Sequence, residues 1–150
     1  MRRKDRRITE AEAFSILENG EYGVLSTVSP SGEPYGVPLN YCLIDSCIFF
    51  HCALEGRKLD HIAGNPNVSF CVVGKTQILP EQFGTRYECC IVAGRASESV
   101  GAEKQRALEA LVRKYSHAFY AEGLKYIEKS RDKARVFKIP IETISGKAKK

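Results

Sequence analysis

The sequence predicts a single, mainly β domain with flanking helices, and three observations support this fold class. At 150 residues the chain is long enough for one hydrophobic core. Its 43% hydrophobic and 27% charged residues are typical of an ordinary globular protein. Short apolar segments bounded by turns outnumber the stretches with helical periodicity. We therefore expect one domain over residues 1–150, built as a small antiparallel barrel with attached helices.

The first half of the chain is expected to form a helix, a three-stranded meander and a second helix. Thr9 and Glu12 make a capping box in front of an apolar helical stripe. The three strands are expected at about 22–28, 34–44 and 47–53. Pro34 and Pro38 lack the N–H that a ladder uses, so the second strand is expected at a sheet edge or with a bulge. The second helix is expected to begin near Arg57 and to end before Pro66.

The second half is expected to add three strands and two helices. In order along the chain we expect a strand at 68–78, a strand at 87–97, a helix at 103–115, a less regular helix near 121–129 and a last strand at 135–144. Gly94 is a candidate bulge, and Pro140 interrupts the last strand. Residues 1–7 and 146–150 are rich in Lys and Arg, and we expect them to be flexible ends.

The net charge of +5 comes largely from these two ends. Basic clusters of this kind bind nucleic acid in some proteins, but at chain ends they are more often simply solvated. The basic start runs into charged residues rather than an apolar region, so it does not resemble a signal peptide. No apolar run approaches the ~20 residues of a membrane helix. We expect a cytoplasmic protein without nucleic-acid or membrane partners.

The six cysteines and three histidines do not form a metal motif. The cysteines lie mostly within apolar runs, which indicates small buried hydrophobic residues. No Cys-x-x-Cys pair is present, and no His follows at zinc-ligand spacing, so we expect no metal. His61 and His117 fall at polar positions and are expected at the surface, whereas His51 lies beside a candidate site.

That candidate site is the turn between the strand ending near Cys52 and the helix beginning near Arg57. Unpaired N–H groups at a helix start point toward a bound anion. Gly56 allows the backbone to approach closely, and Arg57 and Lys58 supply two cations. This combination predicts a phosphate site, although a solvated basic turn in front of an ordinary helix has the same composition. Rossmann, P-loop and nucleophile-elbow motifs are absent from the sequence.

Four blocks of sequence, in this order, resemble the flavin-binding split-barrel superfamily, the group related to pyridoxamine 5'-phosphate oxidase. Within it the similarity is greatest to Nim-type proteins, which are linked to nitroimidazole resistance. The resemblance spans about residues 9–146. The blocks are YGVLST at 22–27, GEPYGVPLNY at 32–41, FHCALEGRKLD at 50–60 and NPNV at 65–68.

The resemblance implies a six-stranded antiparallel Greek-key split barrel that binds FMN at a homodimer interface. The implied phosphate contacts fall on Arg57 and Lys58 beside Gly56, with Cys52 where relatives often carry a small hydroxyl residue. The implied borders of the flavin ring are the residues Val24, Leu25, Ser26, Pro38, Leu39, Asn40 and Tyr41. Strands 47–53 and 88–93 are apolar on both faces, more than one barrel interior buries, which also favours a dimer.

Two functions remain open at this point. In the first, the protein is an FMN-dependent oxidoreductase that passes electrons, with NAD(P)H as a possible donor, to a small aromatic or nitro compound. His51 is then the candidate catalytic residue, because histidine exchanges protons near neutral pH. In the second, the protein binds flavin, or another planar cofactor such as haem, without turnover. The chain has no Trp and ends soon after the last strand, unlike pyridoxamine phosphate oxidases, so that activity is not expected.

Overall fold

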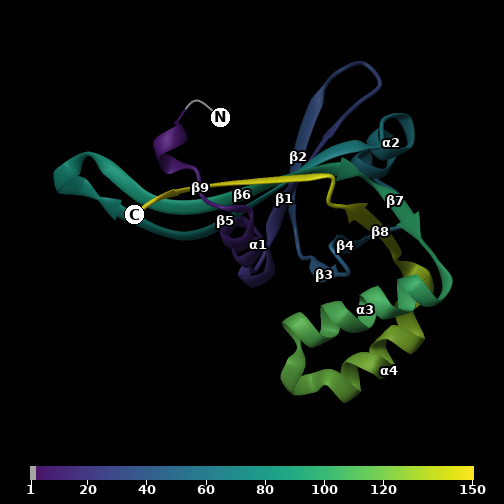
Figure 1. Cartoon of the computed structure of the whole chain (residues 1–150). Coiled ribbons are helices and arrows are strands. Elements are labelled where there is room, and N and C mark those ends of the chain that lie inside the picture. Colours follow the sequence, from purple (N-terminus) through teal and green to yellow (C-terminus); the bar gives the residue numbers. More distant parts are fainter. Residues whose placement is uncertain (1–2) are drawn as a thin grey trace.

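The computed structural model describes residues 3–150, which fold into two antiparallel β-sheets flanked by helices (Figure 1). The strands are β1 Gly23–Val28, β2 Pro34–Leu39, β3 Cys42–Ile44, β4 Cys47–Cys52, β5 Asn67–Leu79, β6 Gly84–Arg95, β7 Ser97–Ser99, β8 Arg135–Pro140 and β9 Thr143–Lys149. One sheet has the order β2-β1-β5-β6-β9, and the other has the order β3-β4-β8-β7. The expected class, mainly β with flanking helices, is confirmed.

The expected count of six strands is not borne out. Three of the expected extended segments each leave one sheet and enter the other, so each is divided into two strands. The breaks fall between β2 and β3, between β6 and β7, and between β8 and β9. Pro140 ends β8, as its missing N–H predicts. β2 lies at the edge of its sheet, as expected from Pro34 and Pro38 within it.

Residues 3–150 contain four α-helices: α1 Glu10–Asn19, α2 Arg57–Gly64, α3 Gly101–Tyr115 and α4 Tyr120–Ser130. Short 3₁₀ helices lie before α1 (η1 Lys4–Arg6), between β5 and β6 (η2 Pro80–Gln82), between α3 and α4 (η3 His117–Phe119) and after α4 (η4 Arg131–Lys133). The capping box at the start of α1 is present, with the Thr9 backbone N–H donating to Glu12 Oε2 at 2.8 Å and the Glu12 N–H donating to Thr9 Oγ1 at 3.2 Å. In Figure 1, α3 and α4 form a hairpin beside the second sheet.

The main core lies between the two sheets and is closed by α1 and α2. Phe50 and Phe137 stack there with ring centroids 5.8 Å apart, and both are almost fully buried. A second cluster lies between the outer face of the second sheet and α3, where Phe49 packs near Leu111. Strand β4 is therefore apolar on both faces because α3 covers the second one. Its pattern does not require a partner chain.

Secondary structure extends into both basic ends. Residues 143–149 form β9, whose ladder with β6 pairs Cys90 with Gly146 and Tyr87 with Lys149. Residues 4–6 form η1, and Arg7 makes an isolated bridge to Lys147. Residues 1–2 of the expected flexible start lie outside the described residues. Backbone pairing thus joins part of both basic ends to the sheet, and their flexibility stays a prediction.

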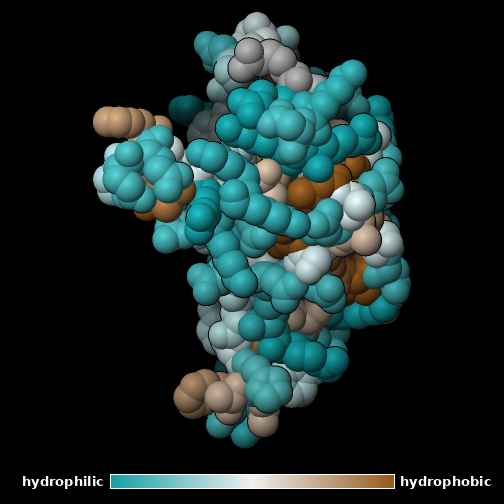
Figure 2. All heavy atoms as spheres, turned by 60° about the vertical axis from the view of Figure 1, so that its left-hand side comes forward, coloured by the Kyte–Doolittle hydropathy of each residue, from teal (hydrophilic) through white to brown (hydrophobic). Residues whose placement is uncertain are grey.

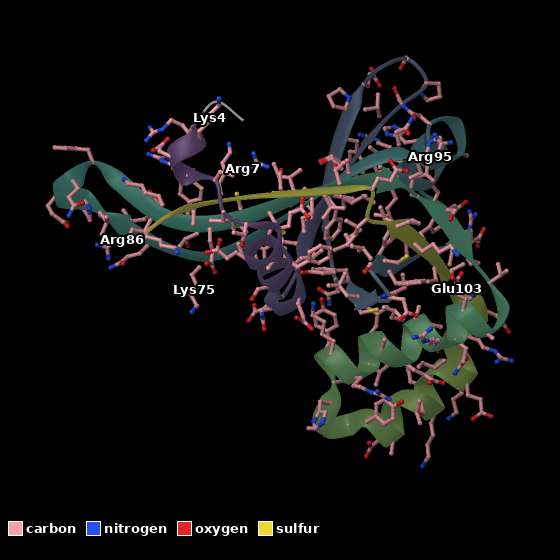
Figure 3. The ribbon with its side chains drawn as sticks, viewed as in Figure 1. Lys4, Arg7, Lys75, Arg86, Arg95 and Glu103 are labelled. Carbon is pink, nitrogen blue, oxygen red and sulfur yellow. The ribbon has the colours of Figure 1, made fainter. Side chains whose placement is uncertain are left out.

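β5 and β6 form a long hairpin that extends beyond the barrel (Figure 1). Figure 3 shows Lys4, Arg7, Lys75 and Arg86 gathered around this hairpin and the N-terminal segment. Figure 2 shows hydrophobic side chains exposed in patches between hydrophilic ones. The hairpin contributes exposed Val73, Ile78 and Ile91, and Phe83 at its tip is fully exposed.

Gly94 is not a bulge. It pairs regularly with Val68, and the irregularity in this ladder lies between Val73 and Thr76. A Cβ on Gly94 would lie 2.2 Å from the backbone oxygen of Pro140. The glycine is therefore required by the close approach of β6 to the end of β8, where the chain passes from one sheet to the other.

Candidate functional site

The residues predicted to hold a phosphate lie at the junction of β4 and α2. Gly56 is the N-cap of α2, with φ 142°, a conformation that favours glycine. Its carbonyl accepts hydrogen bonds from the backbone N–H groups of Leu59 at 2.8 Å and Asp60 at 3.3 Å. The N–H groups of Arg57 and Lys58, the two residues before them, have no intrahelical acceptor. No atom lies within 4 Å of the position of a Cβ on Gly56, so this end of the helix is open.

Arg57 and Lys58 flank this open helix start on different sides. The Arg57 guanidinium lies over the ring of Tyr35 on β2, with Cζ 5.2 Å from the ring centroid. Lys58 lies on the side of β4, close enough for its charge to act on His51 and Cys52. Within residues 3–150 neither cation forms a salt bridge. The junction therefore carries two uncompensated positive charges beside free N–H donors, a setting that suits a phosphate.

Cys52 and His51 point to opposite faces of β4, as strand parity predicts. Cys52 is 8% exposed and packs in the main core, whereas His51 is exposed on the other face. Burial raises the pKa of the Cys52 thiol, against the opposing effect of Lys58. The surrounding protein, and then the Lys58 ammonium, lower the pKa of His51. Cys52 is thus a protonated core thiol, and His51 is a neutral imidazole near neutral pH.

The residues implied for the flavin ring divide into exposed and buried sets. Val24 and Pro38 are directly paired across β1 and β2, and Ser26 pairs with Gly36. These residues lie on the outer face of the five-stranded sheet. Leu25 and Tyr41 are fully buried in the core, so the structure does not bring their side chains to that surface. Leu39 is partly buried against the same core, and Asn40 is exposed in the short link to β3.

Two neighbouring rows across the middle of the outer face of the five-stranded sheet contain no charged residue. One row across it reads Pro38, Val24, Cys71, Ile91 and Ser145, and the next reads Gly36, Ser26, Ser69, Ala93 and Thr143. All ten side chains are small or apolar, and Ile91 is 44% exposed. An uncharged patch of this kind suits contact with another surface or a planar ring.

Sequence reasoning missed three residues that support the site. His61 is 7% exposed rather than at the surface, and its Nδ1 lies 3.0 Å from Oγ1 of Thr27, which is 1% exposed. Tyr35 packs edge-on against the His61 ring, with centroids 5.9 Å apart. The spacing of Arg57 and His61 could have linked His61 to the site, because residues four positions apart share one face of a helix. His117 is exposed, as expected.

Two clefts lie away from this junction. One, of about 660 Å³, lies between β3 and α3, and another, of about 830 Å³, lies between α1 and the β5–β6 hairpin. Neither contains Arg57 or Lys58. Within residues 3–150 no group of three or more His, Cys, Asp or Glu side chains is arranged to hold a metal ion. In the same residues no helix is both long enough and apolar enough to cross a membrane.

The fold and the site define a class: a two-sheet antiparallel barrel with an open, basic helix start between β4 and α2. Residues 9–148 match the profile of the family described as pyridoxamine 5'-phosphate oxidase. The chain belongs to this family, and its fold is one that binds flavins. A search of curated proteins found no significant match.

Solved structures show the same fold at low sequence identity. A candidate 5-nitroimidazole antibiotic resistance protein from Bacteroides thetaiotaomicron is 20% identical, with a TM-score of 0.76 over 95% of this chain and 86% of that one. A FAD- and haem-binding protein from Mycobacterium smegmatis is 14% identical, with a TM-score of 0.83 over 97% and 74%. A FAD-binding protein from Mesorhizobium loti is 22% identical, with a TM-score of 0.67 over 97% and 98%.

Proposed function

We propose that this protein binds FMN through the junction of β4 and α2 and, as a homodimer, reduces small aromatic or nitro compounds. The observation that carries the proposal is the open start of α2. There the space around Gly56 is open, and the backbone N–H groups of Arg57 and Lys58 have no intrahelical acceptor. Among residues 3–150 neither side chain forms a salt bridge with an acidic residue. These are the groups that a phosphate monoester requires. FMN is favoured over FAD because the basic turn is short and offers no second phosphate site.

Bound flavin would supply the electron transfer, and the protein would bind, orient and shield it. The outer-face residues Val24, Ser26 and Pro38 are the candidates for contact with the ring, since they are at least partly exposed and carry no charge. A homodimer would cover this face and complete the pocket. His51 is the candidate for proton exchange with the acceptor, because its imidazole is exposed on β4. Since its pKa is lowered, it would carry a proton to donate mainly at mildly acidic pH.

The first experiment tests cofactor binding. The purified protein is expected to be yellow with a flavin absorption spectrum. A charge-assisted hydrogen bond contributes about 1.5–3 kcal/mol, so Lys58→Ala should weaken FMN by roughly ten- to a hundredfold. Lys125→Ala, an exposed lysine on α4, is the matched control and should leave the affinity unchanged. Equal FMN affinity in the parent and in Lys58→Ala would rule out the assigned site.

The second candidate function is cofactor binding without turnover. It is favoured by a structural neighbour of the same fold that is a FAD- and haem-binding protein. Steady-state oxidation of NAD(P)H with a nitroaromatic acceptor separates the two. Turnover that falls at least about tenfold in His51→Gln, with FMN affinity unchanged, would support the oxidoreductase and the role of His51. A flavin-loaded parent without turnover with this donor and acceptor would favour a binding protein.

A further inference from the structure

Arg57 does not extend freely from the start of α2. Its guanidinium lies over the face of the Tyr35 ring at 5.2 Å. An arginine is attracted to an aromatic face because the ring's π electrons carry partial negative charge. Lys58, the neighbouring cation, has no such support and lies on the β4 side. Of the two cations at the junction, Arg57 is therefore the one whose side chain is held in place before any anion arrives.

The Tyr35 ring is itself fixed by two elements. Tyr35 on β2 pairs directly with Thr27 on β1, and the Thr27 hydroxyl contacts the Tyr35 carbonyl at 3.4 Å. The edge of the ring meets His61 at an interplanar angle of 79°. His61 lies one helical turn after Arg57 and is anchored through the 3.0 Å contact to Thr27. The stack Arg57–Tyr35–His61–Thr27 thus ties the first turn of α2 to the β1–β2 hairpin.

Within the hydrogen bonds described for residues 3–150, the Tyr35 hydroxyl has no partner. The contacts of this side chain are made by the ring. Loss of the hydroxyl should therefore have little effect, whereas loss of the ring should release Arg57. A long side chain that is already ordered loses less conformational freedom when it binds a ligand.

We propose that Tyr35 is a positioning residue for the phosphate of the bound flavin and acts through Arg57. This inference rests on the proposed function and adds a determinant of specificity to it. Tyr35 would favour FMN over riboflavin, which lacks the phosphate, because Arg57 would contact the phosphate and not the flavin ring. The flavin ring would gain nothing from Tyr35, which faces α2 rather than the outer surface of the sheet.

The test compares the affinities of FMN and riboflavin in the parent, Tyr35→Phe and Tyr35→Leu, with folding checked by circular dichroism. Tyr35→Leu should weaken FMN by about three- to tenfold, the range of a cation–ring contact, and leave riboflavin unchanged. Tyr35→Phe should behave as the parent. In an Arg57→Ala background, Tyr35→Leu should have no further effect on FMN, because its intermediary is gone.

Three results would overturn the inference. Equal weakening of FMN and riboflavin by Tyr35→Leu would mean that Tyr35 supports the fold and not the phosphate. Unchanged FMN affinity in Tyr35→Leu would mean that the stack does not position Arg57 for the ligand. If Tyr35→Leu weakened FMN equally in the parent and in the Arg57→Ala background, Tyr35 would act on FMN binding independently of Arg57. A parent that binds no FMN would overturn the proposed function, and this inference with it.

Discussion

His51 and Lys58 are coupled through charge, although neither forms an ion pair in the described chain. The protein around the imidazole and the Lys58 ammonium both disfavour its protonated form, so the pKa of His51 is lowered. We expect Lys58→Ala to raise the pKa of His51, as measured by NMR titration of its imidazole protons. Lys125→Ala, far along the chain on α4, should leave that pKa unchanged. A titration of His51 identical in the parent and in Lys58→Ala would contradict this electrostatic link.

The sign of the accompanying stability change follows from the same shift. The folded pKa of His51 is below its unfolded value of about 6.5. The contribution of neutral His51 to the free energy of unfolding is therefore fully present above the unfolded pKa. It is lost as the pH falls through the folded pKa, where the imidazole must take up a proton. Because His51 is exposed, this change in the free energy of unfolding should be small.

At the residue scale, the sequence was sufficient for groups whose role depends on local chemistry. The Gly56-Arg57-Lys58 turn was predicted because capping, backbone freedom and charge are properties of adjacent residues. His61 was placed at the surface because its burial depends on Thr27, 34 residues away. Leu25 and Tyr41 were assigned to the ring by position in a motif, yet their side chains face the core. Contacts across elements were the part that local patterns did not contain.

At the scale of elements, Gly94 shows how a local rule and the tertiary structure differ. The sequence indicated a bulge, whereas the structure shows a regular pair in a crowded corner. Gly94→Ala would place a Cβ 2.2 Å from the Pro140 oxygen, a backbone atom that cannot rotate away. We expect a loss of about 1–3 kcal/mol in the free energy of unfolding, measured by urea denaturation.

The matched control is Gly36→Ala on β2. The nearest atom to its Cβ would be Val24 Cγ1 at 3.6 Å, an ordinary van der Waals contact. This variant should lie within about 0.5 kcal/mol of the parent, as surface substitutions usually do. Equal stability of the two alanine variants would show that the backbone around Gly94 and Pro140 shifts easily to admit a Cβ, which would contradict close packing there.

Element boundaries were predicted where capping and proline decide them. The start of α1 follows from Thr9 and Glu12, and the end of β8 follows from Pro140. The passage of a strand from one sheet to the other has no such signal, because the backbone stays extended on both sides of the break. The end of β2 at Leu39 and the extension of β9 to Lys149 depend on which strand each segment pairs with. Pairing of this kind is a property of the whole fold.

For the whole molecule, the question is what covers the outer face of the five-stranded sheet. The apolar pattern of β4 is explained by α3, but that of β6 is not, since Ile91 remains 44% exposed. We expect Ile91→Lys to disrupt a homodimer, because a desolvated lysine would be costly at the centre of an uncharged interface. Sedimentation velocity should show the variant at the chain mass of 16.7 kDa and the parent at about twice that mass.

The control for this substitution is Tyr126→Lys on α4, where the side chain is 70% exposed and lies off the sheet. It adds the same charge and should leave the dimer intact. If the second copy completes the pocket, Ile91→Lys should also weaken FMN, whereas Tyr126→Lys should not. A parent that sediments as a 16.7 kDa monomer while it retains flavin would show that one chain holds the cofactor alone. In that case the uncharged face would need an occupant other than a second copy of this chain.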